Sequence, residues 1–460
     1  MRTEDAEIAV VGAGIVGLAV AHYLSAAGRT RIALVDSGPP MALTSARSGE
    51  NYRNWWPHRV MTDFTDRSIA LMEEIARATG NRIGMNRRGY ALATRRERPQ
   101  DLIDQLHDGY GAAAAARVRL HEPGGGASYR PPLSADWEDA PDGVDVLLDR
   151  ALIRRTFPSF DPEVAAVLHI RRAGAIASQQ MGQFMLEQVR GRGGRLVRGR
   201  VAAIERPGER PGAGFRLGLE TPDGPAALDA EILVDAAGPH VGAVAALLGE
   251  ALPVTNVLQQ KIAFEDREGA IPRTMPFAID LDGQSIDWTE EERAALVADP
   301  DHAWLAAPMP GSIHCRPEGG DSGRWIKLGW AYNRAAGEPV PEPAFDPHFP
   351  EVVLRGAARL NPSLRAYYGR LPRGAVLYGG YYTMTPENWP LIGPLATPGA
   401  FVAGALSGFG TMAACATGDL CARWITGAPL PDYAAKLGLA RYGDHALMAE
   451  LTNLESKGVL

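Results

Sequence analysis

The chain has 460 residues, which is enough for two or three domains with substantial cores. Its net charge is −7 and its basic residues are scattered, so a nucleic-acid-binding surface is not expected. The three cysteines have no CxxC spacing, and the apolar run at 6–24 lacks the basic start and the cleavage site of a signal peptide. We therefore expect a cytoplasmic protein in a reducing compartment, without membrane insertion.

The first motif lies in AEIAVVGAGIVGLAVAHYL, where Gly12, Gly14 and Gly17 stand between a predicted strand and an amphipathic helix. A second predicted strand, RIALVD, ends at Asp36, about 20 residues farther on, which completes a nucleotide-binding βαβ unit. The glycines allow a tight turn, close approach of a pyrophosphate and close helix packing, and Asp36 can accept hydrogen bonds from a ribose. This pattern alone does not separate NAD from FAD.

Two later segments are predicted to complete the same nucleotide-binding domain. Residues 227–248 and 400–425 each contain a strand, a glycine turn and a helix. The predicted fold is therefore α/β, with a Rossmann-type domain built from discontinuous segments and a second, antiparallel-sheet (α+β) substrate domain. No second strand–GxGxxG–helix unit occurs, and we interpret the glycines at 191–194 as a turn, so a separate NAD(P)H domain is not expected.

The chain resembles the D-amino-acid oxidase/glycine oxidase/sarcosine oxidase superfamily of FAD oxidoreductases over most of its length. The resemblance rests on the first motif and on four later ones in the family's order: GRVAAIE, VDAAGPHVG, YYTMTPENWPLIG and GALSGFGTMAA. It implies an FAD-binding domain at 1–85, 150–250 and 370–430, a substrate or cap domain at 86–149 and 251–369, and a tail at 431–460. Strands are expected at 258–265, 303–307 and 325–332, and residues 99–150 are interpreted as a surface insertion or lid.

The resemblance also implies which residues hold the FAD. The adenine is expected near Val201 and the isoalloxazine near the glycine turn that follows Gly404. The expected FAD-binding residues are Gly12, Gly14, Ile15, Val16, Gly17, Asp36, Ser37, Ser45, Ser48, Gly49, Val201, Ala237, Gly238, Gly404, Ser407, Gly408, Phe409, Gly410 and Thr411.

The segment GRWIKLGW, residues 323–330, contains a lysine among apolar residues. In a strand, Ile326 and Leu328 would face the core, whereas Lys327 and Gly329 would face the other side, where a glycine often allows another group to approach. In the monomeric sarcosine oxidase branch, a Lys-Leu-Gly strand places its lysine against the flavin, where it is proposed to activate dioxygen. The resemblance implies that role for Lys327; a salt-bridged or solvated lysine is the alternative.

The sequence also departs from the sarcosine oxidase branch. Gly380 stands where that branch attaches FAD to a cysteine, so noncovalent FAD is expected. Thr411 replaces the lysine that binds the substrate carboxylate, and Ala331 replaces the active-site histidine. The substrate is therefore not expected to be sarcosine itself.

The substrate-side candidates come from three segments. In TSARSGENYRNWWPHRV, Arg53 is expected to bind a substrate carboxylate, because a guanidinium matches it with two parallel hydrogen bonds; stacking on Trp55 or Trp56 is the structural alternative. His314 and Arg316 are further candidates, each with a purely structural alternative. Tyr382 is a candidate substrate contact, with a role in the core as the alternative, and Glu387, which replaces the family's usual aspartate, is expected to hold its loop.

These observations together predict an FAD-dependent oxidase of an amine or amino acid. The family chemistry transfers hydride from the α-C–H to flavin N5, gives an imine, and reduces dioxygen to hydrogen peroxide. The first alternative is a dehydrogenase of an amine or a 2-hydroxy acid with a quinone or flavoprotein acceptor, and the second is an NAD(P)H-dependent flavin monooxygenase. No metal site is expected, the partner is a small molecule, and the sequence does not indicate the oligomeric state.

Overall fold

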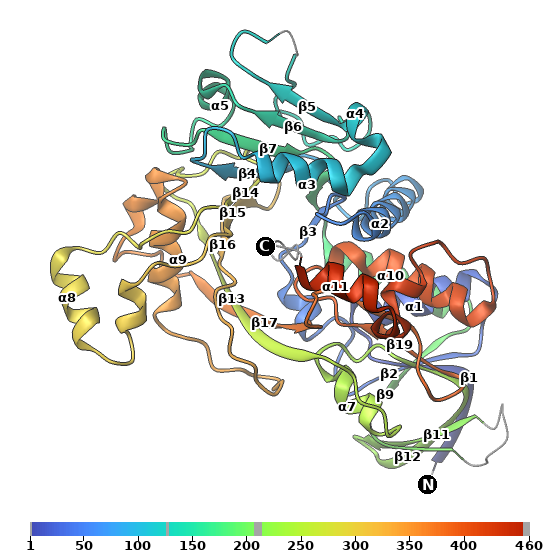
Figure 1. The fold of residues 1–460 in the computed structure, drawn as a ribbon. Coiled ribbons are helices and arrows are strands. Elements are labelled where there is room, and N and C mark those ends of the chain that lie inside the picture. Colours follow the sequence, from blue (N-terminus) through green and yellow to red (C-terminus); the bar gives the residue numbers. More distant parts are fainter. Residues whose placement is uncertain (1, 126–127, 207–213, 454–460) are drawn as a thin grey trace.

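The computed structural model describes residues 2–125, 128–206 and 214–453, and two large β-sheets dominate it (Figure 1). The first sheet is built from three distant parts of the chain. In spatial order it contains β10 (Arg200–Glu205), β11 (Phe215–Thr221), β12 (Gly224–Asp235), β1 (Arg2–Val11), β2 (Ile32–Asp36) and β9 (Arg195–Arg198). It is extended beside β12 by β19 (Ala400–Gly404) and then by β18 (Leu391–Pro394).

The strands at the centre of the first sheet run parallel, as the βαβ pattern predicts. β1 pairs in parallel with β2 and with β12, and β12 pairs in parallel with β19. Strands from opposite ends of the sequence therefore lie side by side. This arrangement confirms a Rossmann-type domain assembled from discontinuous segments.

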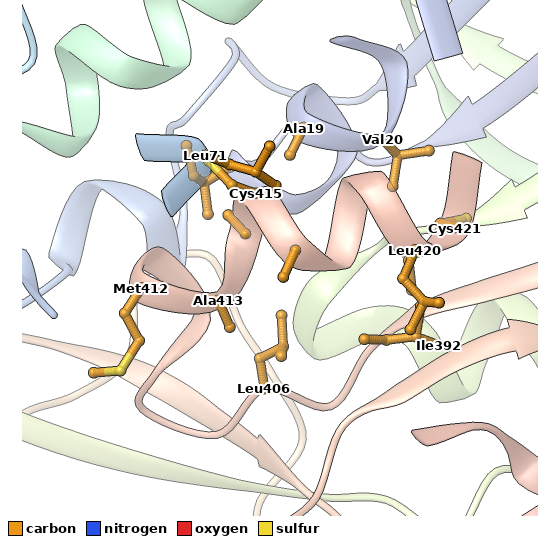
Figure 2. Close-up of a cluster of buried hydrophobic side chains, with 14 of the residues drawn as sticks. Ala19, Val20, Leu71, Ile392, Leu406, Met412, Ala413, Cys415, Leu420 and Cys421 are labelled. Atoms are coloured by element: carbon orange, nitrogen blue, oxygen red, sulfur yellow. The ribbon is translucent and has the colours of Figure 1, made fainter. Parts of the chain in front are cut away.

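Helices cover the first sheet and form the largest core. Helix α1 (Ile15–Ala26) packs on α10 (Gly410–Thr426) and α6 (Ser178–Gly191), and α10 also packs on α2 (Arg59–Ala78). Figure 2 shows the side chains where these helices meet, including Leu71, Cys415 and Leu420. A Cβ on Gly418 would lie 2.5 Å from the Ala19 carbonyl carbon, so this glycine sets how closely α10 approaches α1.

The second sheet is mostly antiparallel and has a helix on each face. Its order is β17 (Val376–Met384), β13 (Thr255–Glu265), β16 (Trp325–Gly329), β15 (Ile313–Glu318), β14 (Phe277–Asp280), β4 (Tyr90–Thr94), β7 (Ala166–Ile170), β6 (Val144–Leu147) and β5 (Val118–His121). Helix α9 (Phe349–Ala358) covers the face formed by Ile326, Leu328 and Cys315. On the other face, α3 (Gln100–Tyr110) packs near Leu92 and Ile279, and the rest of that face borders the cavity described below.

The remaining elements are short. They are β3 (Asn51–Arg53) paired with β8 (Ala173–Ala175), α4 (Ala114–Arg117), α5 (Arg150–Thr156), α7 (Val241–Ala246), α8 (Glu290–Ala298) and α11 (His445–Asn453). None of the helices in the described ranges combines the length and apolar composition needed to cross a bilayer.

Three expectations about the second sheet need correction. The segment 303–307 was predicted to be a strand, but Ala303–Ala306 forms a 3₁₀ helix. Residues 99–150 are more than an insertion, because they supply α3, α4 and the strands β5 and β6. Strands β7 and β17 lie in the second sheet, although the expected boundaries place their residues in the FAD-binding domain. In a short apolar segment such as 303–307, the pattern of apolar residues does not distinguish a strand from a helix.

Candidate functional site

The turn between β1 and α1 can be made only by glycines. Gly12 has a φ of 105°, and a Cβ on it would lie 2.3 Å from the carbonyl oxygen of Ala236. A Cβ on Gly17 would lie 1.9 Å from the Gly12 carbonyl oxygen. Gly14 is the N-cap of α1 and provides no side-chain hydrogen bond to the first turn of the helix. The N-terminal end of α1 is therefore suited to binding a phosphate through its backbone N–H groups.

Asp36 and Ser45 lie beside this turn. The Asp36 carboxylate accepts hydrogen bonds from the backbone N–H groups of Ala13 (2.7 Å) and Gly38 (2.8 Å). Each carboxylate oxygen has a further lone pair, so a ribose hydroxyl could still donate to it. The Ser45 hydroxyl accepts from the Ile15 N–H at 3.0 Å. The glycine turn, the helix end and this carboxylate together fit the pyrophosphate and ribose of a dinucleotide.

A second glycine turn lies between β19 and α10. Ala405 and Ser407 have positive φ values of 56° and 45°, an uncommon conformation that clusters at functional sites. A Cβ on Gly408 would lie 2.4 Å from Cζ of Tyr382, so the glycine lets this ring pack on the turn. The Thr411 and Ser48 hydroxyls are hydrogen-bonded at 2.8 Å, which joins α10 to the loop before β3.

A cavity lies between this turn, the loop before β3 and the free face of the second sheet. The sheet contributes side chains from five strands, and most of them are aromatic or cationic. The lining residues are Ser48, Gly49, Glu50, Asn51, Arg53, Trp56, Tyr90, Lys261, Phe277, His314, Tyr382, Asn388, Ser407, Gly408, Phe409, Thr411 and Met412.

Arg53 is the most deeply buried cation of the cavity wall. It is 2% exposed, and its guanidinium carbon lies 4.7 Å from the centroid of the Trp56 ring. Burial lowers the pKa of Arg53 to about 10, so the guanidinium stays protonated at neutral pH. Stacking and cavity lining are therefore both present. Trp55, in contrast, packs in the core beside Tyr110.

His314 and Lys261 meet across Gly329. Gly329 on β16 is paired with His314 on β15 at one side and with Lys261 on β13 at the other. A Cβ on Gly329 would lie 2.3 Å from Nε2 of His314 and 3.2 Å from Cγ of Lys261. Burial and the positive charge of Lys261 lower the pKa of His314 to about 3, which keeps the imidazole neutral. The close approach predicted at Gly329 is therefore made by an imidazole and a second lysine.

Known proteins were compared with this chain by sequence and by structure. Residues 7–424 match the family described as DAO, FAD dependent oxidoreductase. The chain belongs to this family.

Several solved structures share the fold at low sequence identity. The L-proline dehydrogenase of P. horikoshii is 17% identical, with a TM-score of 0.71 over 96% of this chain and 99% of that chain. The glycine oxidase of Geobacillus kaustophilus is 17% identical, with a TM-score of 0.67 over 95% and 99%. The iminodiacetate oxidase of Chelativorans sp. is 15% identical, with a TM-score of 0.62 over 94% and 98%.

In this DAO-family chain, Lys327 lies in an ion-pair network and is not among the residues that line the cavity. Its Nζ is 2.9 Å from Glu318 Oε2 and 3.4 Å from Glu50 Oε2. Arg316 is 2.6 Å from Glu318 Oε2 and donates to the Gly49 carbonyl oxygen at 3.0 Å. Two cations thus face two carboxylates, and of these four side chains Glu50 alone is part of the cavity wall.

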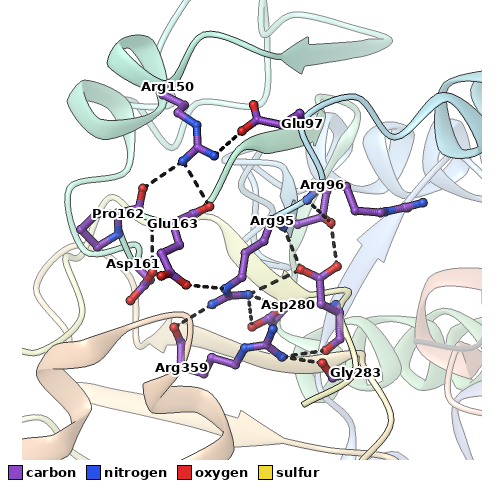
Figure 3. Close-up of polar contacts among 12 residues, drawn as sticks. Arg95, Arg96, Glu97, Arg150, Asp161, Pro162, Glu163, Asp280, Gly283 and Arg359 are labelled. Atoms are coloured by element: carbon purple, nitrogen blue, oxygen red, sulfur yellow. Dashed lines mark hydrogen bonds and ion pairs between the residues drawn. The ribbon is translucent and has the colours of Figure 1, made fainter. Parts of the chain in front are cut away.

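Another group of charged side chains, which we call the outer cluster, lies at the end of β14 and beside α9 (Figure 3). It contains Arg95, which contacts Asp280 at 3.0 Å and Asp282 at 3.6 Å. Arg150 contacts Glu97 at 2.6 Å, and Arg359 donates to the Gly283 carbonyl oxygen at 2.7 Å. The cluster connects β4, β14 and the end of α9, and it shares no residue with the cavity wall.

The described part of the expected tail, residues 431–453, contains a buried arginine. Arg441 is 1% exposed; its Nε donates to Glu387 Oε1 at 2.7 Å, and its Nη1 donates to the Pro390 carbonyl oxygen at 2.7 Å. Glu387 precedes Asn388, which has a positive φ of 62° and lines the cavity. The sequence predicts that Glu387 holds its loop, and the structure adds Arg441 as its partner.

Proposed function

We propose that this protein uses noncovalently bound FAD to oxidise an amine or amino acid whose carboxylate binds Arg53. The observation that carries the proposal is a buried guanidinium in the wall of the cavity that the second glycine turn closes. FAD, when bound, supplies the acceptor for two electrons from the substrate. The DAO-family membership supports the same substrate class, and so do the structural relatives, which include a glycine oxidase and an L-amino acid deaminase.

The residues of the cavity wall have separate roles in this proposal. Arg53 orients the substrate through two parallel hydrogen bonds to its carboxylate, and the ring of Trp56 fixes the guanidinium. His314 offers a neutral imidazole, so it adds no positive charge that would disfavour an amine. Tyr90, Phe277 and Tyr382 are bulky rings that exclude water from the substrate carbon.

Noncovalent attachment agrees with the positions of the cysteines. Cys315 packs in the core under α9, and Cys415 and Cys421 lie in the core of α10, so all three are buried away from the cavity. A Cβ on Gly380 would lie 3.3 Å from Cβ of Arg47 and 3.5 Å from Cγ2 of Thr44. Acid precipitation of the yellow protein should release all flavin as FAD; flavin that stays in the pellet would contradict this part of the proposal.

The substrate class is tested by mixing the oxidised holoenzyme, under anaerobic conditions, with a panel of amines, amino acids and 2-hydroxy acids. Bleaching of the flavin absorbance by amino acids, and not by 2-hydroxy acids, is the expected result. Bleaching by 2-hydroxy acids alone would contradict the proposed substrate class. Bleaching only on addition of NADPH would favour a monooxygenase.

A dehydrogenase is the second candidate function, and one observation favours it. Lys327, which the resemblance places against the flavin, is paired with Glu50 and Glu318, so little net positive charge remains to stabilise an anion formed from dioxygen. Admitting air or a quinone to the reduced enzyme separates the two candidates. Rapid reoxidation by air favours the oxidase, and rapid reoxidation by the quinone alone favours the dehydrogenase.

A further inference from the structure

Lys261 is a buried cation that faces the cavity without an acidic partner. It is 7% exposed and belongs to the cavity wall. Within the part of the chain that the structure describes, its Nζ makes no hydrogen bond or ion pair, and it lies over the Tyr382 ring, 5.6 Å from the ring centroid. Burying an ammonium group is strongly unfavourable unless an anion accompanies it.

The neighbouring strand shows that this sheet provides carboxylates where a lysine is only structural. Lys327 on β16 has both Glu50 and Glu318 within 3.4 Å. Among the described residues no carboxylate forms an ion pair with Lys261, although β13 and β16 are hydrogen-bonded neighbours. An anion that pairs with Lys261 would therefore enter through the cavity.

A series of ring contacts connects the two cations of the cavity wall. The Arg53 guanidinium carbon lies 6.0 Å from the centroid of the Tyr90 ring. The ring centroids of Tyr90 and Phe277 are 4.6 Å apart, and those of Phe277 and His314 are 5.0 Å apart. His314 then meets Lys261 across Gly329. Both cations line the same cavity, so a ligand that reaches both would carry two anionic groups.

We infer that Lys261 binds a second carboxylate of the substrate, and that the substrate class is an amine or amino acid with two carboxylates. This inference rests on the proposed function, because it assumes that the substrate occupies this cavity with one carboxylate on Arg53. A neutral amino acid would leave Lys261 unpaired, whereas a dicarboxylic substrate compensates both cations. Lys261 is then the residue that sets specificity between the two kinds of substrate.

Binding of unreactive diacids to the holoenzyme tests this inference without turnover. Malonate, succinate and glutarate are titrated by calorimetry and by the change in flavin absorbance, each beside its monomethyl ester. At least one diacid should bind about 30-fold more tightly than its ester, because truncating one partner of a buried charge pair has effects of this size. Equal affinities of every diacid and its ester would overturn the inference.

Two variants assign the effect to the side chain. Lys261→Met keeps the length of the side chain and should abolish the preference for the diacid, whereas Lys261→Arg should retain it. The exposed Lys436→Met is the matched control and should bind like the wild type. A Lys261→Met holoenzyme that still prefers the diacid would overturn the inference; if that variant does not fold, the comparison in the wild type still decides.

Turnover separates this inference from the function on which it rests. The kcat/KM values for glutamate and aspartate are compared with those for glutamine and asparagine. Equal values within each pair would reject the role of Lys261 and leave amino-acid oxidation standing. Tight diacid binding with no flavin reduction by any amine would reject amine oxidation and leave Lys261 as a carboxylate-binding residue.

Discussion

The cavity wall and the outer cluster are both rich in cations, but they differ in how the charges are compensated. In the outer cluster, Arg95 has two carboxylates within 3.6 Å and Asp280 is completely buried with it. In the cavity wall, Lys261 has no acidic partner among the described residues, although it is almost equally inaccessible to solvent. The comparison indicates that paired cations hold elements together, whereas the unpaired lysine is available to a ligand.

Replacing Arg95 should produce the largest change in stability. Arg95→Met leaves the buried Asp280 without its ion-pair partner, and breaking a buried ion pair in this way costs about 3–5 kcal/mol. Urea denaturation would show this loss in the free energy of unfolding, while kcat/KM of the folded enzyme stays unchanged. Arg365→Met is the control, because this exposed arginine pairs with an exposed Asp287 and should change stability by about 1 kcal/mol or less. A large loss of activity in folded Arg95→Met would break the comparison.

Replacing Arg53 should mainly affect catalysis. Arg53→Ala removes the proposed carboxylate contact and should lower kcat/KM by about 30-fold or more, which corresponds to about 2 kcal/mol. FAD content should not change. The decarboxylated amine serves as the control substrate, since it should react equally well with wild type and variant. Wild-type enzyme that oxidises this amine as fast as the amino acid would show that no carboxylate is recognised.

Acidification tests a buried group that is kept neutral instead of paired. Burial and the charge of Arg171 lower the pKa of His169 to about 3, and its Nε2 donates to the Arg88 carbonyl oxygen at 2.8 Å. The unfolded chain binds a proton at this histidine below about pH 6.5, so stability should fall as the pH decreases from 6.5 towards 3. The contribution is about 1.4 kcal/mol per pH unit.

Urea denaturation at pH 7 and pH 5 measures this dependence. His169→Gln should show a shallower loss of stability than the wild type over that interval. His445→Gln, at an exposed position, should leave the slope unchanged. An identical slope in His169→Gln would show that other groups account for the acid sensitivity.

Replacing Lys327 should have the smallest effect if its charge is already compensated. The family resemblance predicts that Lys327→Met slows reoxidation by dioxygen by about two to three orders of magnitude, the effect expected for an uncompensated charge near the flavin. The pairing with Glu50 and Glu318 leads us to expect a change of about tenfold or less. Rapid-mixing measurements of the reduced enzyme with dioxygen decide, and a hundredfold decrease would restore the role that the resemblance implies.

Local patterns predicted the parts of the fold that depend on neighbouring residues. The glycine spacing correctly predicts the turn before α1. The alternation around Lys327 correctly places Ile326 and Leu328 in the core, where both are completely buried. One of the two partners of Lys327, Glu50, could not be predicted, since it lies 277 positions away and reaches the lysine only through tertiary packing. Lys261 was not among the predicted site residues. The segment LQQKIAFE has the same alternation of side chains, but the Lys-Leu-Gly motif of the family contains Lys327 and not Lys261.

The distant position of Arg441 could not be predicted for the same reason. Nothing in the sequence near Glu387 indicates a cation more than 50 residues later. The expected lid was inferred from composition, which reports solvent preference and gives no information on pairing across a sheet. The strands β5 and β6 are recognisable only once β7 provides the edge on which they pair.

The contact between Arg441 and Glu387 also affects how the protein is made. The nucleotide turn at Gly12 leaves the ribosome first, but the loop that carries Asn388 is held by an arginine synthesised more than 400 residues later. Until that arginine arrives, the buried carboxylate of Glu387 has no cation, and one wall of the cavity is not secured. We expect nascent chains halted before Arg441 to retain FAD poorly, and cofactor capture to be among the last steps of biosynthesis.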